Sequence, residues 1–311
     1  MMFETTSRRC LRSVATLLLL SFVSTSFAGE GLPWVHKFEE AQAKAKKEKK
    51  DLFINFTGSD WCGWCKRLDA EVFTQGDFAK TAGKDFIFVF IDFPKAADLK
   101  AKVPDPKSNE ELQKKYGVQG FPTILLTDAE GRVYGRTGYQ EGGPEKYLAS
   151  LTKFREGGEK IKALLDNKKK NKQVELLKAA LPVLAEQDLL DLPEYKDFLD
   201  QAKKLDAKGE HGLLPIVLGH EENKALLKLV DLPRGQAPDW NKVNDQIKAS
   251  KHANGRTFGN ITIACADWLR KQKRHADAKT LYERLLTDPA AKDDPRVQAG
   301  LKDCEEQLKK S

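Results

Sequence analysis

The sequence predicts an α/β fold, a mixed sheet flanked by helices, followed by an all-α region. Two short apolar and β-prone runs, residues 51–56 and 86–93, are separated by helical patterns. Residues 124–136 then have the pattern of a hairpin, two β-prone runs around a turn. Beyond residue 157 we find helical patterns only. A chain of 311 residues has the length of about two domains.

The first half has the order helix, strand, helix, strand, helix, strand, strand, helix. Pro33 fits the first turn of the opening helix. Ser108 and Glu111 form a capping-box pattern, and Gly117 is typical of a helix end. The expected helices are residues 33–50, 62–73, 108–116 and 144–154, and the expected strands are 51–56, 86–93, 124–127 and 132–136.

Gly157 and Gly158 mark the expected domain boundary. We therefore divide the chain into residues 1–28, 29–157 and 158–311, the last being an α-helical domain. Its expected helices are residues 161–184, 193–205, 225–230, 240–249, 257–273, 275–286 and 297–308. Residues 276–289 resemble the second helix of a tetratricopeptide repeat, but a repeat array needs about three copies. An irregular bundle and a degenerate tetratricopeptide-like array both remain open.

Charge and composition exclude some classes of function. The formal net charge is +7, of which Arg8, Arg9 and Arg12 against Glu4 contribute +2. The remaining excess is spread over many Lys and Glu residues, which indicates a solvated surface. No aromatic and basic nucleic-acid motif accompanies it. We therefore expect no nucleic-acid partner.

The N-terminus has the pattern of a signal peptide. Arg8, Arg9 and Arg12 precede an apolar run over residues 14–23, and residues 26–28 (Ser-Phe-Ala) suit a signal peptidase. The apolar run is shorter than the roughly 20 residues that span a bilayer. We expect cleavage after Ala28 and a periplasmic or secreted protein, a location in which disulfides are permitted.

Cys62 and Cys65 carry the strongest chemical signal. They lie three residues apart, after a buried strand and at the start of a helix, so both sulfurs would share one helical face. Free N–H groups and the dipole at a helix start favour a thiolate at Cys62. We expect Cys62 to attack a substrate disulfide and Cys65 to resolve the mixed disulfide. Asp60 would oppose the thiolate and Lys66 would favour it.

Two motifs occur together in residues 34–155: Trp61-Cys62-Gly63-Trp64-Cys65-Lys66 after a strand, and Gly120-Phe121-Pro122-Thr123 before the hairpin. On these motifs the segment resembles the thioredoxin superfamily, in its exported bacterial CxxC branch. The resemblance implies a thiol–disulfide oxidoreductase with a cis peptide bond at Pro122. It also implies a substrate-binding edge beside the cysteines, for which the candidates are Trp61, Gly63, Trp64, Phe121, Pro122 and Thr123.

Two residues depart from thioredoxin itself. Trp64 stands between the cysteines where thioredoxin has proline. Asn55 is the strand residue that best matches the buried acid of thioredoxin, and an amide cannot take up a proton in a relay. The pair is therefore expected to exchange disulfides without behaving like thioredoxin in every respect.

Other roles for the cysteines stay open. Cys62 and Cys65 also suit a static disulfide or half of a zinc site, but no His pair or second CxxC supplies the remaining ligands. We therefore expect no metal and no organic cofactor. Cys265 and Cys304 complete the four cysteines after Ala28, either as buried thiols or as a second disulfide.

The leading function is thiol–disulfide exchange with protein substrates, supported by an unidentified redox partner. The direction of electron flow stays open. The alternative is a non-catalytic interaction protein whose helical domain binds a partner and whose first domain is a scaffold.

Overall fold

The computed structural model describes residues 32–167, 172–233 and 235–310. Its sheet has four strands in the order β2-β1-β3-β4. β1 pairs in parallel with β2 and antiparallel with β3, and β3 pairs antiparallel with β4 across a bulge at Leu126/Thr127. The strands are β1 (Asp51–Thr57), β2 (Phe86–Asp92), β3 (Thr123–Thr127) and β4 (Val133–Thr137). The expected mixed sheet is confirmed.

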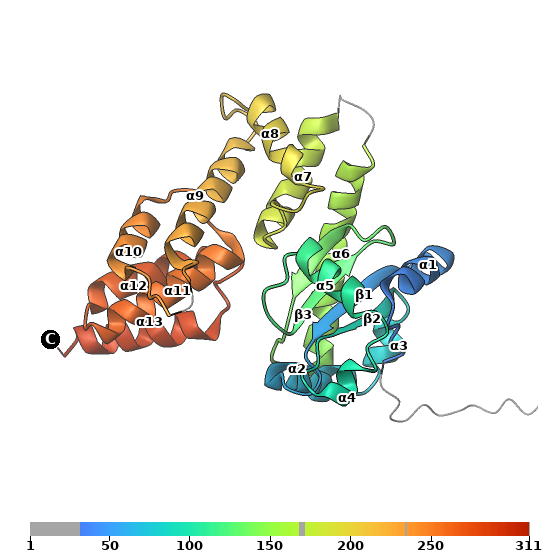
Figure 1. Ribbon diagram of the computed structural model, residues 1–311. Helices are drawn as coiled ribbons and strands as arrows, with labels where there is room; N and C mark the ends of the chain where they lie inside the picture. The colour runs from blue at the N-terminus through green and yellow to red at the C-terminus, as the bar shows by residue number, and fades with distance from the viewer. Residues whose placement is uncertain (1–31, 168–171, 234, 311) are drawn as a thin grey trace, which may run out of the picture. The chain divides into compact units, whose positions relative to one another are not determined.

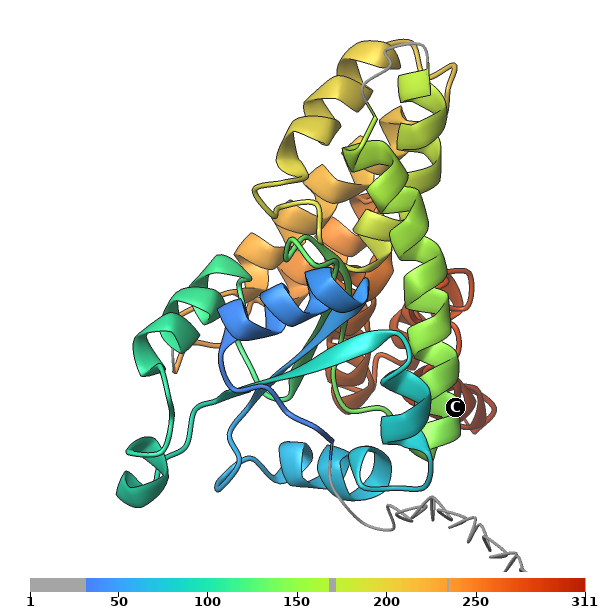
Figure 2. The same cartoon turned by 90° about the vertical axis from the view of Figure 1, so that its right-hand side faces the viewer.

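Helices cover both faces of this sheet (Figures 1 and 2). The alternation of side chains along β1 divides the packing between the two faces. Phe53 packs edge-on against the rings of Phe73 and Phe78, whereas Phe56 meets Tyr116. The elements of this half are α1 (Phe38–Glu48), α2 (Gly63–Leu68), η1 (Asp69–Phe73), α3 (Phe78–Ala82), α4 (Ala97–Lys100), α5 (Pro106–Lys115) and α6 (Gly143–Leu165).

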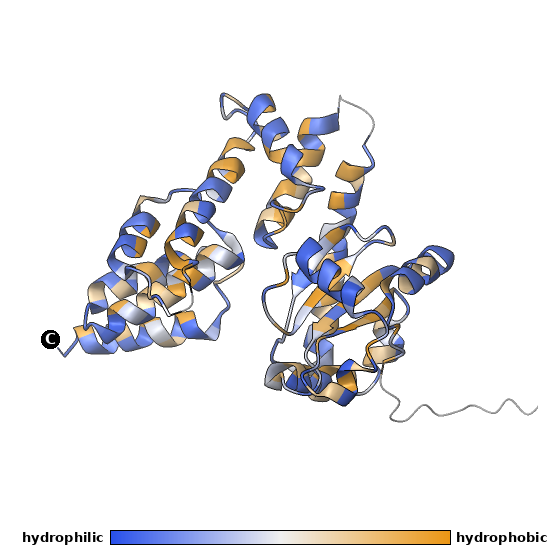
Figure 3. Cartoon of the chain, in the orientation of Figure 1, coloured by the Kyte–Doolittle hydropathy of each residue, from blue (hydrophilic) through white to orange (hydrophobic). Residues whose placement is uncertain are grey.

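From α7 onward the described part of the chain contains helices but no strand. They are α7 (Gln173–Glu186), α8 (Lys196–Leu205), α9 (Leu214–Val230), α10 (Trp240–Ala249), α11 (Gly255–Lys271), α12 (His275–Leu285) and α13 (Pro295–Leu308). Figure 3 shows apolar colour on the strands and a mixture of apolar and polar residues along these helices. The prediction of an α/β part followed by helices is thus confirmed.

α6 runs without interruption through Gly157 and Gly158. Both glycines are buried, and a Cβ atom on Gly158 would lie 2.7 Å from the Tyr134 ring in β4. The absence of side chains therefore permits close packing of the helix against the sheet. The pair is not a linker, and the division of the chain at residue 157 stays a prediction.

Apolar residues on both sides of that pair share one core. It runs from Leu32 to Val217 and includes the fully buried Leu177 and Tyr195. The Tyr195 hydroxyl donates to the Val133 carbonyl in β4 at 2.5 Å, and this contact joins the helical part to the sheet. A second core lies within residues 226–304.

Several predicted helix ends were wrong. Residues 34–37 precede α1, and Val35 makes a bridge to Val89 instead of a helical turn. α5 begins before Ser108, because the Asp105 carboxylate accepts the Ser108 N–H at 2.9 Å and is the cap. The single helix expected over residues 161–184 is the end of α6 followed by α7.

Two further expectations concern the end of α5 and the N-terminus of the chain. Gly117 ends α5 with a φ of 59°, in the left-handed region that suits glycine. The signal peptide expected at 1–28 lies outside the described residues. Within the described ranges, no helix is long and apolar enough to cross a bilayer.

Candidate active site

Cys62 and Cys65 form a disulfide at the start of α2, with Cα atoms 5.2 Å apart. Cys62 is the N-cap of that helix, and its sulfur accepts the Cys65 N–H at 3.2 Å. An acceptor in this position satisfies one of the free N–H groups of a helix start. Each cysteine is 6% exposed. The Cys62 sulfur therefore sits at a helix start that favours negative charge.

The loop between β1 and α2 is held by one hydrogen bond within the loop and by two hydrogen bonds to the end of β2. The Cys62 N–H donates to the Gly58 carbonyl at 2.8 Å. Ser59 donates its N–H and its hydroxyl to the Asp92 carboxylate, at 2.9 and 2.6 Å. Asp92 is the last residue of β2, so the two parallel strands together position the loop that carries Cys62.

Asp60 points its charge toward another loop. Its carboxylate accepts the N–H groups of Lys95 and Ala96 at 2.8 to 3.1 Å. Burial opposes that charge, but these backbone donors lower the pKa of Asp60 overall. The Lys66 ammonium donates to the Asp60 carbonyl at 2.6 Å. Both charges expected to act on Cys62 are thus engaged in local contacts.

Trp61 is partly packed and partly exposed. Its indole N–H donates to the Phe93 carbonyl at 2.8 Å, and its ring meets the Phe121 ring edge-on at 5.9 Å. The Lys95 ammonium lies 4.2 Å from the indole centroid. The side chain remains 42% exposed, so it presents a fixed apolar edge beside Cys62.

Trp64 is 55% exposed and lies in a cluster that the sequence did not indicate. Its ring meets the Tyr139 ring at 5.1 Å, and the Arg67 guanidinium lies over both rings. The Glu71 carboxylate accepts from Arg67 and from the Tyr139 hydroxyl, each at 2.6 Å. The i,i+4 spacing of Arg67 and Glu71 was a usable signal, whereas nothing in the sequence linked Tyr139 to them.

The remaining predicted residues lie near this edge. The Phe121–Pro122 peptide bond is cis. Phe121 stacks on Phe93 at 5.1 Å and contacts Trp61, which brings the Pro122 loop beside the cysteine loop. Thr123 opens β3, and its hydroxyl donates to the Gly120 carbonyl at 2.7 Å. Gly63 is exposed at the first position of α2.

Asn55 is buried in β1 between its partners Phe90 and Ile124. Its Oδ1 atom has no hydrogen-bond partner. The other two cysteines are buried free thiols, so the second disulfide is not formed. Burial raises the pKa of Cys265 to about 12 and also raises that of Cys304. Across the described residues, no group of three or more His, Cys, Asp or Glu side chains could hold a metal ion.

A family model described as a thioredoxin-like domain matches residues 38–155. The chain is 33% identical over 126 residues to the disulfide bond reductase DsbH of Chlamydia pneumoniae. The aligned region covers 40% of this chain and 73% of that protein. The chain belongs to the thioredoxin superfamily. Its branch is the bacterial one with a CxxC pair, and α7 to α13 lie beyond the family match.

Two other relatives extend the comparison. The thioredoxin-related protein DsbJ of Chlamydia pneumoniae is 29% identical over 140 residues, covering 42% of this chain and 40% of that protein. A solved structure of the DsbH oxidoreductase is 28% identical, covers 48% of this chain and 94% of its own, and gives a TM-score of 0.35. Family membership and the Cys62–Cys65 disulfide identify a thiol–disulfide oxidoreductase and leave its direction open.

Proposed function

We propose that this thioredoxin-superfamily protein is exported and exchanges disulfides with protein substrates through Cys62 and Cys65. The observation that carries the proposal is the position of the disulfide. It caps the start of α2, and Trp61 on one side and Trp64 between the cysteines expose apolar rings around it. A reactive pair with an apolar rim suits polypeptide substrates.

In the reducing direction, the Cys62 thiolate attacks one sulfur of a substrate disulfide. A Cys62–substrate disulfide forms, and the other substrate sulfur leaves as a thiolate that takes a proton from solvent. The Cys65 thiolate then attacks the Cys62 sulfur, which releases the second substrate thiolate. Two electrons pass from the Cys62–Cys65 dithiol to the substrate, and the reverse sequence oxidises a substrate dithiol.

The Cys65 N–H contributes to this chemistry. It donates to the Cys62 sulfur at 3.2 Å, and the same contact strengthens when the acceptor is a thiolate. The helix dipole acts in the same sense. Cys62 is therefore assigned as nucleophile and Cys65, which has no such position at the helix start, as the resolving residue.

The substrate-binding edge is assigned to Trp61, Gly63, Trp64 and the segment Phe121–Thr123. Pro122 has no N–H to donate, and Thr123 begins β3 next to it. Backbone groups at the start of a strand suit pairing with an extended substrate chain.

The name of the relative DsbH, a disulfide bond reductase, supports testing the reducing direction first. Turnover then requires a redox partner that returns electrons to the pair. Export is supported by the signal-peptide pattern over residues 1–28 and by the Cys62–Cys65 disulfide, a bond that an oxidising compartment permits. In this proposal residues 29–157 carry the redox chemistry and residues 158–311 contribute to recognition of protein partners.

Insulin reduction in the presence of dithiothreitol tests the activity. The wild-type protein should accelerate the reaction, and Cys62→Ser should abolish the acceleration. In Cys65→Ser a mixed disulfide with the substrate should accumulate, and mass spectrometry should locate it on Cys62. Equal rates for wild type and Cys62→Ser would refute the enzyme and leave a scaffold whose helical domain binds a partner.

A further inference from the structure

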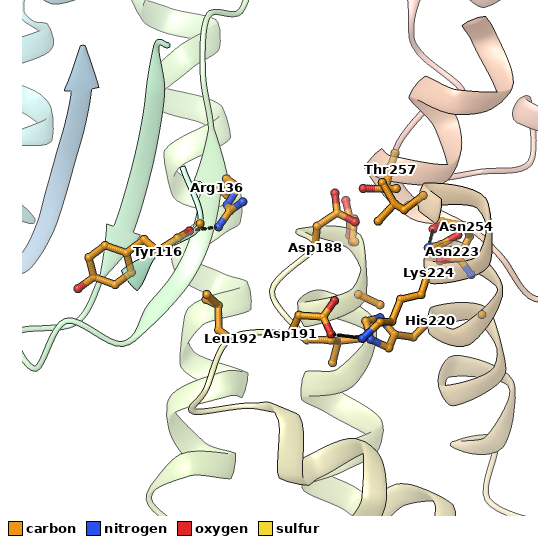
Figure 4. Close-up of a pocket in the computed structure, with 18 of the residues that line it drawn as sticks. Tyr116, Arg136, Asp188, Asp191, Leu192, His220, Asn223, Lys224, Asn254 and Thr257 are labelled. Atoms are coloured by element: carbon orange, nitrogen blue, oxygen red, sulfur yellow. Dashed lines mark hydrogen bonds and ion pairs between the residues drawn. The ribbon is translucent and has the colours of Figure 1, made fainter. Parts of the chain in front are cut away.

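A cavity of about 880 Å³ lies between two parts of the chain. One side is formed by β4 and the segment from the end of α5 to the start of β3, and the other by helices after α6. Figure 4 shows Arg136 of β4 on one wall, His220, Asn223 and Lys224 of α9 on the opposite wall, and Asp188 and Asp191 between them. Ligand sites in proteins usually have volumes of about 300 to 1,000 Å³. The cavity is therefore large enough for several residues of an extended polypeptide.

The cavity adjoins the loop that carries Phe121 and Pro122. Residues 117–120 and Thr123, on both sides of Phe121 and Pro122, form part of its lining. Phe121 in the same loop contacts the Trp61 ring, next to Cys62. A chain lying along the Pro122 loop would thus have the cavity beside it.

The walls combine apolar surface with charges of both signs. Leu192, Ile216 and Leu227 contribute apolar side chains, and Leu227 is 39% exposed although it is a large aliphatic residue. On the polar side, Arg136 donates to the Tyr116 carbonyl at 2.6 Å, and Asp191 accepts from Lys224 at 3.0 Å. Such a lining suits apolar side chains and amide groups together, and it does not select a simple anion or cation.

Direct contacts hold the walls together. The Arg256 guanidinium at the start of α11 donates to the Arg136 carbonyl at 2.7 Å. The Tyr195 hydroxyl donates to the Val133 carbonyl of the same strand. The helices after α6 are therefore attached to β4 by one buried and one partly buried polar contact, and the cavity is part of the packed structure.

We propose that this cavity binds the segment of the substrate polypeptide that flanks the reacting cysteine. This inference rests on the proposed exchange with protein substrates and adds a role for the helices beyond α6. According to this proposal, Leu227 of α9 makes an apolar contact with the substrate. The protein then selects a substrate by the residues that flank the substrate's disulfide as well as by the disulfide itself.

The test compares Leu227→Glu with Leu205→Glu. Leu205 is 42% exposed at the end of α8, lies outside the cavity lining and is the matched control. Each reduced protein reacts with insulin and with the small aromatic disulfide 5,5′-dithiobis(2-nitrobenzoate). We expect Leu227→Glu to raise the KM for insulin about tenfold, equivalent to about 1.4 kcal/mol of binding free energy. Its rate with the small disulfide should be unchanged.

The outcomes separate the two proposals. Equal KM values for insulin in Leu227→Glu and Leu205→Glu would overturn the cavity assignment while leaving the redox function intact. A wild-type protein no faster than Cys62→Ser with either disulfide would overturn the function itself. A second readout uses benzoylphenylalanine at position 227 or 205 in the Cys65→Ser mixed disulfide with insulin. Crosslinks to insulin from position 227 alone support the proposal, and their absence from position 227 contradicts it.

Discussion

Gly158→Ala should weaken the packing of α6 against the sheet. The added Cβ atom would lie 2.7 Å from Cδ2 and 2.8 Å from Cγ of Tyr134, whereas ordinary contacts begin at 3.4 Å. Tyr134 is 1% exposed, and its hydroxyl donates to the Asp51 carboxylate at 2.7 Å. Lys162 of α6 also binds that carboxylate at 3.0 Å. The ring cannot turn away without breaking this partly buried hydrogen-bond network.

The helix must therefore move by about 0.7 Å, the difference between 3.4 and 2.7 Å. Overpacking of this kind costs about 1–3 kcal/mol, and the better helix propensity of alanine returns about 1 kcal/mol. We expect a net loss of up to about 2 kcal/mol in the free energy of unfolding.

Urea unfolding followed by far-ultraviolet circular dichroism measures this loss. Gly157→Ala is the neighbouring control, because its Cβ atom would meet one methyl group of Val183 at 2.8 Å, with the other methyl group at 3.8 Å. We expect that variant to lie closer to wild type. The reasoning is wrong if Gly158→Ala is as stable as Gly157→Ala.

Three further predictions concern charge, thiols and the exposed ring. Glu222 accepts three backbone N–H groups of residues 251–253 at 2.6 to 3.0 Å; burial opposes its charge, but these donors lower its pKa overall. The charged Glu222 side chain therefore adds to the free energy of unfolding above its unfolded pKa of about 4.3. This contribution is lost as the pH falls through the lower pKa of the folded state. Glu222→Gln should cost about 1 kcal/mol at pH 7, after allowance for solvent screening, and the difference in urea midpoint should vanish in acid; a pH-independent difference would contradict this. In the reduced protein, Ellman's reagent should modify the CxxC pair first, and Cys265 and Cys304 only after unfolding; rapid modification of four thiols in native protein would refute their burial. Trp64→Ala should raise the KM for insulin about tenfold and leave the rate with a small aromatic disulfide within about twofold, and unchanged insulin kinetics would remove Trp64 from the binding edge.

The sequence was informative wherever a feature depends on near neighbours. The strands at 51–57 and 86–92 are dense apolar runs, and the CxxC pair follows the first of them directly. These patterns are short-range, so the composition of a few residues carries them. Pro122 and its neighbours were instead identified through the resemblance to the thioredoxin superfamily.

Helix continuity was harder to predict. Gly157 and Gly158 have the composition of a linker, yet α6 continues through them. Their lack of side chains leaves room for Val183 and Tyr134, which pack against the helix at these positions. The capping residue of α5 was also misassigned, since both Asp105 and Ser108 suit a cap and the geometry chose Asp105. In each case a tertiary or local geometric contact outweighed propensity.

Sequence alone determined the redox pair and the sheet strands, because each is encoded by adjacent residues, and the family resemblance added the loop at Pro122. Only the tertiary structure decided that Asp92 holds the Cys62 loop, that Tyr139 and Glu71 surround Trp64, and that Thr123 and Leu227 line one cavity. Those contacts join residues tens to about a hundred positions apart. Chain spacing carries no periodic signal at such distances, and only packing brings the side chains together.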